Sequence, residues 1–149
     1  MGRVEKSIEI KAPPEKVWEM LALDRFEDWD KRARESMKIV EYTSEVNTPE
    51  DKCKVGASAR ITDDRGKQFF MEVEESLENE KIVYHSDLMS SSITNDLEPV
   101  KEGTILTKTT DYELPYGSFG RLADKLFGQR MVGKETERSF EQFKTILEK

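Results

Sequence analysis

Apolar and polar residues alternate along several short stretches of the chain, as they do in the strands of a half-buried sheet. Val4, Ile8 and Ile10 alternate with polar neighbours and predict a first strand. The same signal, interrupted by turns, predicts six further strands: Met37–Ser44, Val55–Thr62, Gln68–Glu74, Lys81–Leu88, Ser90–Leu97 and Thr104–Leu114. Because the loops between the last of these strands are short, we expect sequential strands to pair antiparallel.

The C-terminal part of the chain has helical spacing instead. Ser118 can cap a helix N-terminus and no proline follows it, so we predict a helix over Ser118–Glu148. At 1.5 Å per residue this helix would be ~45 Å long and would have to lie along something large. Its apolar residues form two stripes, Phe119–Phe127 and Val132–Leu147. The positions between the stripes are small or polar and face either a cavity or the solvent.

The segment Pro13–Trp29 predicts two short helices joined end to end. Apolar residues at helical spacing begin at Val17, and Asp24 can cap a second helix in which Phe26 and Trp29 are three positions apart. The predicted order is therefore strand, two short helices, six strands and one long helix. We expect a single α+β domain over residues 1–149, in which a curved antiparallel sheet of six or seven strands wraps around the long C-terminal helix.

The composition limits the classes of partner that the protein can be expected to bind. The chain has 149 residues and a formal net charge of −7, which argues against nucleic acid and anionic membrane surfaces. No apolar run approaches the ~18 residues of a membrane span, so no integral membrane segment is expected. Cys53 is the only cysteine, which excludes an internal disulfide and fits a reducing, cytoplasmic location.

The chemistry-bearing residues do not form a recognisable catalytic constellation. His85 is the only histidine, and alternation puts it on the strand face opposite Tyr84. Cys53 lies in a charged loop with nothing to activate it, and too few histidines and cysteines exist for a zinc site. We therefore predict no catalytic residue, no metal and no cofactor. Arg130 could meet a ligand carboxylate or carbonyl, or it could pair with Glu137 on the surface.

Four motifs in order resemble a known superfamily. They are Ile8–Trp18 with its A-P-x-E-x-V-W pattern, Gly103–Thr107, Leu114–Asp124 and Phe140–Glu148. Together they are similar to the START-related helix-grip (SRPBCC) superfamily, in its polyketide cyclase/dehydrase branch. The resemblance spans nearly the whole chain. It implies a helix-grip fold with a hydrophobic cavity between sheet and long helix, and it does not imply catalysis.

Three functions follow as alternatives. The first is a carrier or sensor that binds a small hydrophobic or amphipathic molecule, whether lipid-like, polyketide-like or isoprenoid-like. The second is a cyclase/dehydratase-type enzyme that acts on such a ligand. The third is a protein-interaction module that binds an unknown protein partner through the exposed sheet or the region Trp29–Met37. The absence of an acid–base constellation favours the first. The residues expected to line the cavity are Phe26, Trp29, Ala59, Ile61, Phe69, Met71, Leu106, Tyr112, Leu126, Gln129, Arg130 and Gly133.

Overall fold

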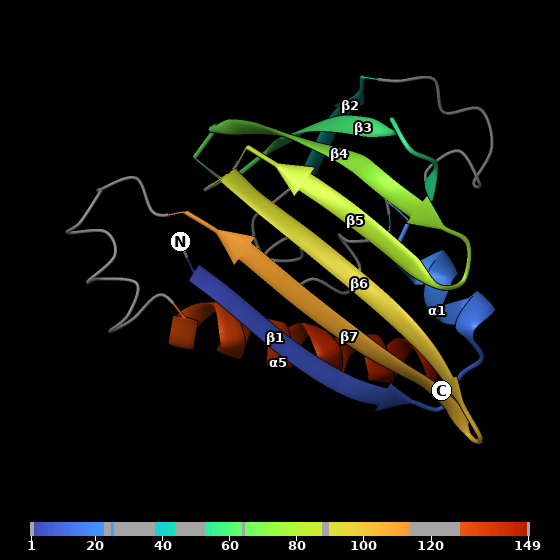
Figure 1. Cartoon of the computed structure of the whole chain (residues 1–149). Helices are drawn as coiled ribbons and strands as arrows, with labels where there is room; N and C mark the ends of the chain where they lie inside the picture. Colours follow the sequence, from blue (N-terminus) through green and yellow to red (C-terminus); the bar gives the residue numbers. More distant parts are fainter. Residues whose placement is uncertain are drawn as a thin grey trace.

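A computed structural model describes residues 2–22, 25, 38–43, 53–63, 65–87, 90–113 and 129–148 (Figure 1). Its elements follow the predicted order. They are β1 (Gly2–Ile10), α1 (Pro14–Met20), β2 (Lys38–Tyr42), β3 (Ser58–Thr62), β4 (Gln68–Leu77), β5 (Lys81–Ser86), β6 (Ser91–Val100), β7 (Gly103–Tyr112) and α5 (Gln129–Leu147).

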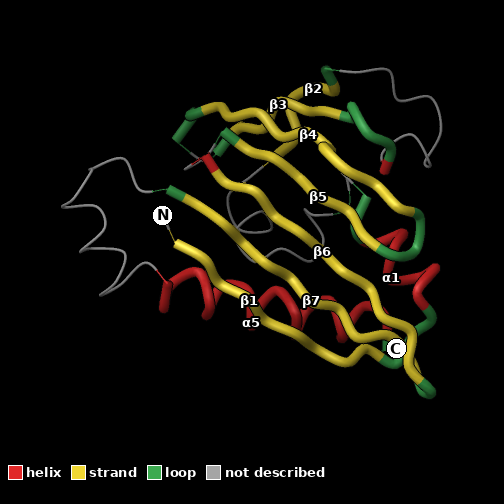
Figure 2. The backbone as a smooth tube through the Cα atoms, in the orientation of Figure 1, coloured by secondary structure: helices red, strands yellow, loops and turns green. Residues whose placement is uncertain are grey.

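The seven strands form one antiparallel sheet in the order β1-β7-β6-β5-β4-β3-β2. The sheet is curved, and α5 runs along the side of it that carries β1 and β7 (Figures 1 and 2). This arrangement confirms the predicted helix-grip fold, a curved antiparallel sheet wrapped around a long C-terminal helix. Two parts of the prediction lie outside the described residues. They are the second short helix, around Phe26 and Trp29, and the first part of the predicted long helix, residues 118–128.

The start of β3 differs from the prediction. Residues 55–57 were expected to begin the strand, but Gly56 has φ +92° and its N–H donates to the Val73 carbonyl at 2.9 Å. A positive φ belongs to a turn, and the alternation of apolar residues alone does not reveal it. Val55 consequently lies 63% exposed at this turn, and β3 begins at Ser58.

The register divides the sheet into two faces, because successive side chains of a strand point to opposite sides. We call the face that packs against α1 and α5 the inner face. It carries Val4, Lys6, Ile8 and Ile10 of β1, Thr104, Leu106, Lys108, Thr110 and Tyr112 of β7, Ser91, Ile93, Asn95 and Leu97 of β6, Ile82, Tyr84 and Ser86 of β5, Phe69, Met71 and Val73 of β4, and Ala59 and Ile61 of β3. None of these inner-face residues is acidic.

The start of β7 makes a very close contact with the end of β1. A Cβ on Gly103 would lie 2.0 Å from the Ile10 carbonyl oxygen, so only glycine fits there. The hydroxyl of the next residue, Thr104, donates to the Ala12 carbonyl at 2.8 Å and is fully buried. These two contacts give a physical reason for a glycine–threonine pair at the start of this strand.

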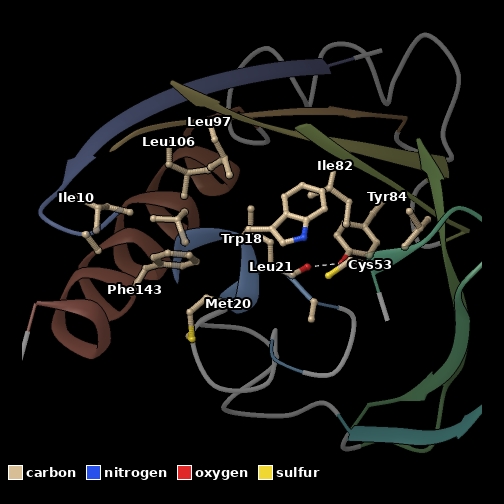
Figure 3. Close-up of a cluster of buried hydrophobic side chains, with 14 of the residues drawn as sticks. Ile10, Trp18, Met20, Leu21, Cys53, Ile82, Tyr84, Leu97, Leu106 and Phe143 are labelled. Carbon is tan, nitrogen blue, oxygen red and sulfur yellow. Dashed lines mark hydrogen bonds between the residues drawn. The ribbon is translucent and has the colours of Figure 1, made fainter. Parts of the chain in front are cut away.

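Side chains from α1 fill the adjacent end of the sheet. Trp18 lies between Phe143 and Leu106 on one side and Ile82 and Tyr84 on the other (Figure 3). The Tyr84 hydroxyl donates to the Leu21 carbonyl just after α1, so its polar atom is satisfied within this core. The α1 end of the sheet is therefore a packed apolar core.

The buried face of α5 contains Val132, Gly133, Thr136, Ser139, Phe140 and Phe143. The last two belong to the core around Trp18, and Leu147 packs against it. Near the other end of α5, Val132 forms a separate small cluster with Val4 and Tyr112. The stripe predicted over Val132–Leu147 therefore contacts two separate apolar clusters, and the stripe predicted over Phe119–Phe127 lies outside the described residues.

Replacing Phe140 with alanine tests the docking of α5. Phe140 is 4% exposed, so the cavity left behind should lower the free energy of unfolding by ~3–5 kcal/mol. Denaturant melts measure this loss. Glu141→Ala, on the exposed side of the same turn, should change stability by less than about 0.5 kcal/mol. Similar small losses in both variants would contradict the docking.

Two glycine-to-alanine changes should have opposite effects. Gly103→Ala pushes a methyl group against backbone and should cost about 1–3 kcal/mol or more. Gly133→Ala meets only side chains, Lys6 at 3.4 Å and Val4 at 3.9 Å, and should stabilise α5 by up to ~0.5–1 kcal/mol. Thermal melts of the two variants should shift in opposite directions, and equal shifts would show that the Gly103 contact is wrong.

Candidate functional site

The predicted site residues of β3 and β4 lie together on the inner face. Ala59 pairs with Met71 and Ile61 pairs with Phe69 across the two strands. Ala59 and Ile61 are fully buried, Phe69 is nearly so, and Met71 keeps partial exposure. These strands form the arm of the sheet farthest from β1 and α5 (Figure 1).

Leu106 and Tyr112 also lie on the inner face, where their shared parity in the last strand had suggested they would be. Leu106 packs in the core around Trp18, whereas Tyr112 belongs to the small cluster with Val4 and Val132. The two residues therefore lie toward opposite ends of β7 and pack in different clusters.

Two residues of the predicted helical wall, Arg130 and Gly133, have described side-chain surroundings. Gly133 is buried, but a Cβ there would contact the Lys6 Cε at 3.4 Å and the Val4 Cγ1 at 3.9 Å. Its small size lets α5 approach β1 and does not leave an open space. Arg130 is exposed, and Glu137 pairs with the Lys6 Nζ at 3.1 Å, not with Arg130. Gln129 begins α5 as described. Phe26, Trp29 and Leu126 lie outside the described residues.

The structure adds a feature that the sequence reasoning missed, a polar row over three neighbouring strands of the inner face. The row consists of Lys6 on β1, Lys108 on β7 and Asn95 on β6, which lie directly opposite one another in the register. Lys108 is 7% exposed and Asn95 2% exposed. The signal was present in the alternation, because Lys108 has the same parity as Leu106 and Tyr112.

On β1 and β7, the polar row separates the two apolar clusters. Leu106 and Leu97, beside it toward α1, belong to the core around Trp18. Val4 and Tyr112, on the other side, belong to the small cluster. Next to the row, Ile93 and Thr110 face each other in the middle of the sheet; Ile93 packs against the core around Trp18, and both residues remain partly exposed. The inner face is therefore not a continuous apolar core.

Asn95 has an unsatisfied polar atom. Its side-chain oxygen Oδ1 is buried and has no hydrogen-bond partner. Leaving a buried acceptor without a partner costs ~1–3 kcal/mol, and such groups are rare in native structures. An orphaned amide oxygen next to a buried lysine is the strongest indication of a polar ligand contact within the described residues.

The remaining chemistry-bearing residues lie away from this row. His85 is on the outer face, with its Nδ1 3.7 Å from Glu74 Oε1, as its alternation with Tyr84 predicted. Cys53 is a buried thiol in the core beside Tyr84 (Figure 3). Within the described ranges, no three His, Cys, Asp or Glu side chains gather as metal ligands would. No helix in that part of the chain is both long and apolar enough to cross a membrane.

Comparison with known proteins identifies the class. The family described as polyketide cyclase / dehydrase and lipid transport matches residues 1–148, so the chain belongs to this family. This confirms the resemblance to the cyclase/dehydrase branch of the START-related superfamily. A search of curated proteins gave no match.

Solved structures show the same fold at low identity. A Thermus thermophilus protein is 23% identical with a TM-score of 0.69, covering 97% of this chain and 95% of that one. A Mesorhizobium loti protein is 20% identical with a TM-score of 0.68, covering 99% and 97%. DynU16, a protein in the dynemicin biosynthetic locus, is 17% identical with a TM-score of 0.63, covering 98% of this chain and 47% of its own.

Replacing Asn95 with leucine tests whether its oxygen is unsatisfied. Because the change removes a buried polar group without breaking a hydrogen bond, the free energy of unfolding of the ligand-free protein should stay the same or rise, by up to about 2 kcal/mol. Denaturant melts measure the difference. A loss of more than ~1 kcal/mol would show that Asn95 has a stabilising partner in the folded protein.

Proposed function

We propose that the protein binds a small hydrophobic or amphipathic molecule between the inner face of its sheet and the C-terminal helix, as a carrier or sensor. The ligand would be lipid-like, polyketide-like or isoprenoid-like. The family supports a ligand-binding or cyclase-type role, because its description names both lipid transport and polyketide cyclases and dehydrases.

One observation carries the proposal, the interruption of the apolar inner face. Ile93 lies on β6, an interior strand of the sheet, yet it keeps partial exposure beside Thr110. An inner face covered completely by a helix would bury both of these side chains. Apolar walls with a few polar groups are the usual lining of a small-molecule site.

A cyclase/dehydratase-type enzyme is the runner-up. Its support is the polar chemistry on the inner face, where Lys108 could polarise a ligand carbonyl. Against it, His85 lies on the outer face and cannot serve as a base toward a ligand on the inner face. The binding role therefore has the stronger support. The region 29–37, considered for a protein partner, lies outside the described residues.

Two tryptophan substitutions at neighbouring positions of β6 test the binding role. Ile93→Trp places a large side chain on the partly exposed inner face, whereas Thr94→Trp places the same side chain on the outer face. Titration with an uncharged environment-sensitive dye such as Nile red should show saturable binding by the wild type, weakened roughly tenfold by Ile93→Trp and little changed by Thr94→Trp.

Thermal melts should show that both tryptophan variants are folded, so that a loss of dye binding reports the site. No saturable binding by the wild type, or equal weakening by the two variants, would count against a ligand site on the inner face.

A further inference from the structure

The polar row places two lysines on the inner face of the sheet. The formal net charge of the chain is −7, yet the described inner-face residues of the sheet include two lysines and no acidic residue. The outer lysine of the two, Lys6, is paired with Glu137 of α5 at 3.1 Å. Lys108 lies deeper, between Lys6 and Asn95. A lysine ammonium has three N–H donors, so Lys108 can donate to an anionic or carbonyl oxygen of a ligand in addition to a partner within the protein.

Asn95 specifies a second polar contact. Its Oδ1 is an acceptor without a partner, and its position directly opposite Lys108 puts the two side chains within reach of one small head group. A ligand hydroxyl suits this amide in either orientation, because a hydroxyl can donate to Oδ1 or accept from Nδ2. A purely apolar ligand would leave the amide oxygen unsatisfied.

We propose that Asn95 and Lys108 bind the oxygenated end of an amphipathic ligand, with a hydroxyl at Asn95 and a neighbouring carboxylate or carbonyl oxygen at Lys108. This inference rests on the proposed binding function and names its ligand class, a hydroxy-acyl compound. The apolar part of the ligand then lies beside the row, against Ile93 and its neighbours on the inner face. A β-hydroxy acid and a hydroxylated polyketide chain both offer this pair of oxygens.

Three probes separate the contributions: tetradecanoic acid, β-hydroxytetradecanoic acid and the methyl ester of the hydroxy acid. Calorimetric titration of the wild-type protein should show that the hydroxy acid binds roughly tenfold more tightly than the plain acid, the factor expected for one well-made buried hydrogen bond. Asn95→Leu should abolish this preference and leave the affinity for tetradecanoic acid nearly unchanged.

Lys108→Met separates the two sources of the second oxygen. Weaker binding of the hydroxy acid but not of the ester indicates a carboxylate at Lys108, and equal weakening of both indicates a carbonyl. No weakening of either overturns the role of Lys108. The matched control is Lys101→Met, which removes the same charge from the exposed turn between β6 and β7 and should change no affinity.

The wild-type titrations alone decide whether the inference stands, because they require no variant to fold. If the acids with and without the hydroxyl bind equally tightly, the proposed function survives and the hydroxy-acyl class is wrong; a buried water then satisfies Asn95. If the wild type binds neither the three probes nor Nile red, the binding function itself fails.

Discussion

The pairing of β1 with β7 is the contact on which the rest of the structure depends. It joins the first strand of the chain to the last, with Ile8 opposite Leu106 and Lys6 opposite Lys108. The helix α5 then packs on β1, and the Lys11 N–H donates to the Glu148 carboxylate at 2.9 Å just beyond the helix. Closing a loop of this length costs chain entropy, which the paired backbone and the buried residues of α5 must offset. A slip of one residue would move every inner-face side chain of β1 to the solvent.

This pairing also separates the charges of the sheet. On the exposed face, some acidic residues form cross-strand ion pairs. Asp111 pairs with Arg3 at 2.6 Å, and Glu41 pairs with Arg60 at 2.5 Å. Exposed pairs of this kind contribute little stability, and the net negative charge of the surface keeps the protein dispersed in water. The described inner-face residues of the sheet, by contrast, include no acidic residue, and the charge of Lys6 on that face is paired with Glu137 of α5 at 3.1 Å.

Much of the fold was predictable from the sequence because the alternation of side chains and the helical spacing are local signals. The seven strands, their antiparallel pairing and the buried face around Phe140 and Phe143 followed from them. The site was less predictable, because it depends on which strands meet. The parity that placed Leu106 and Tyr112 inside also placed Lys108 inside, but a lysine between threonines is ordinarily a solvent-facing residue. Similarly, the role of Gly133 required knowledge that Lys6 lies against it.

The polar row has a cost, and that cost bears on its purpose. A buried lysine and an unsatisfied amide are each less favourable than apolar side chains of similar size, which would join the two clusters into one core. Buried polar groups can be retained because they fix strand register. Here the register is already fixed at the end of β1. Only a glycine fits at position 103 against the Ile10 carbonyl, and the Thr104 hydroxyl donates to the Ala12 carbonyl. Since the fold does not need Asn95 and Lys108 for its register, recognition of a polar group on a ligand accounts best for their position.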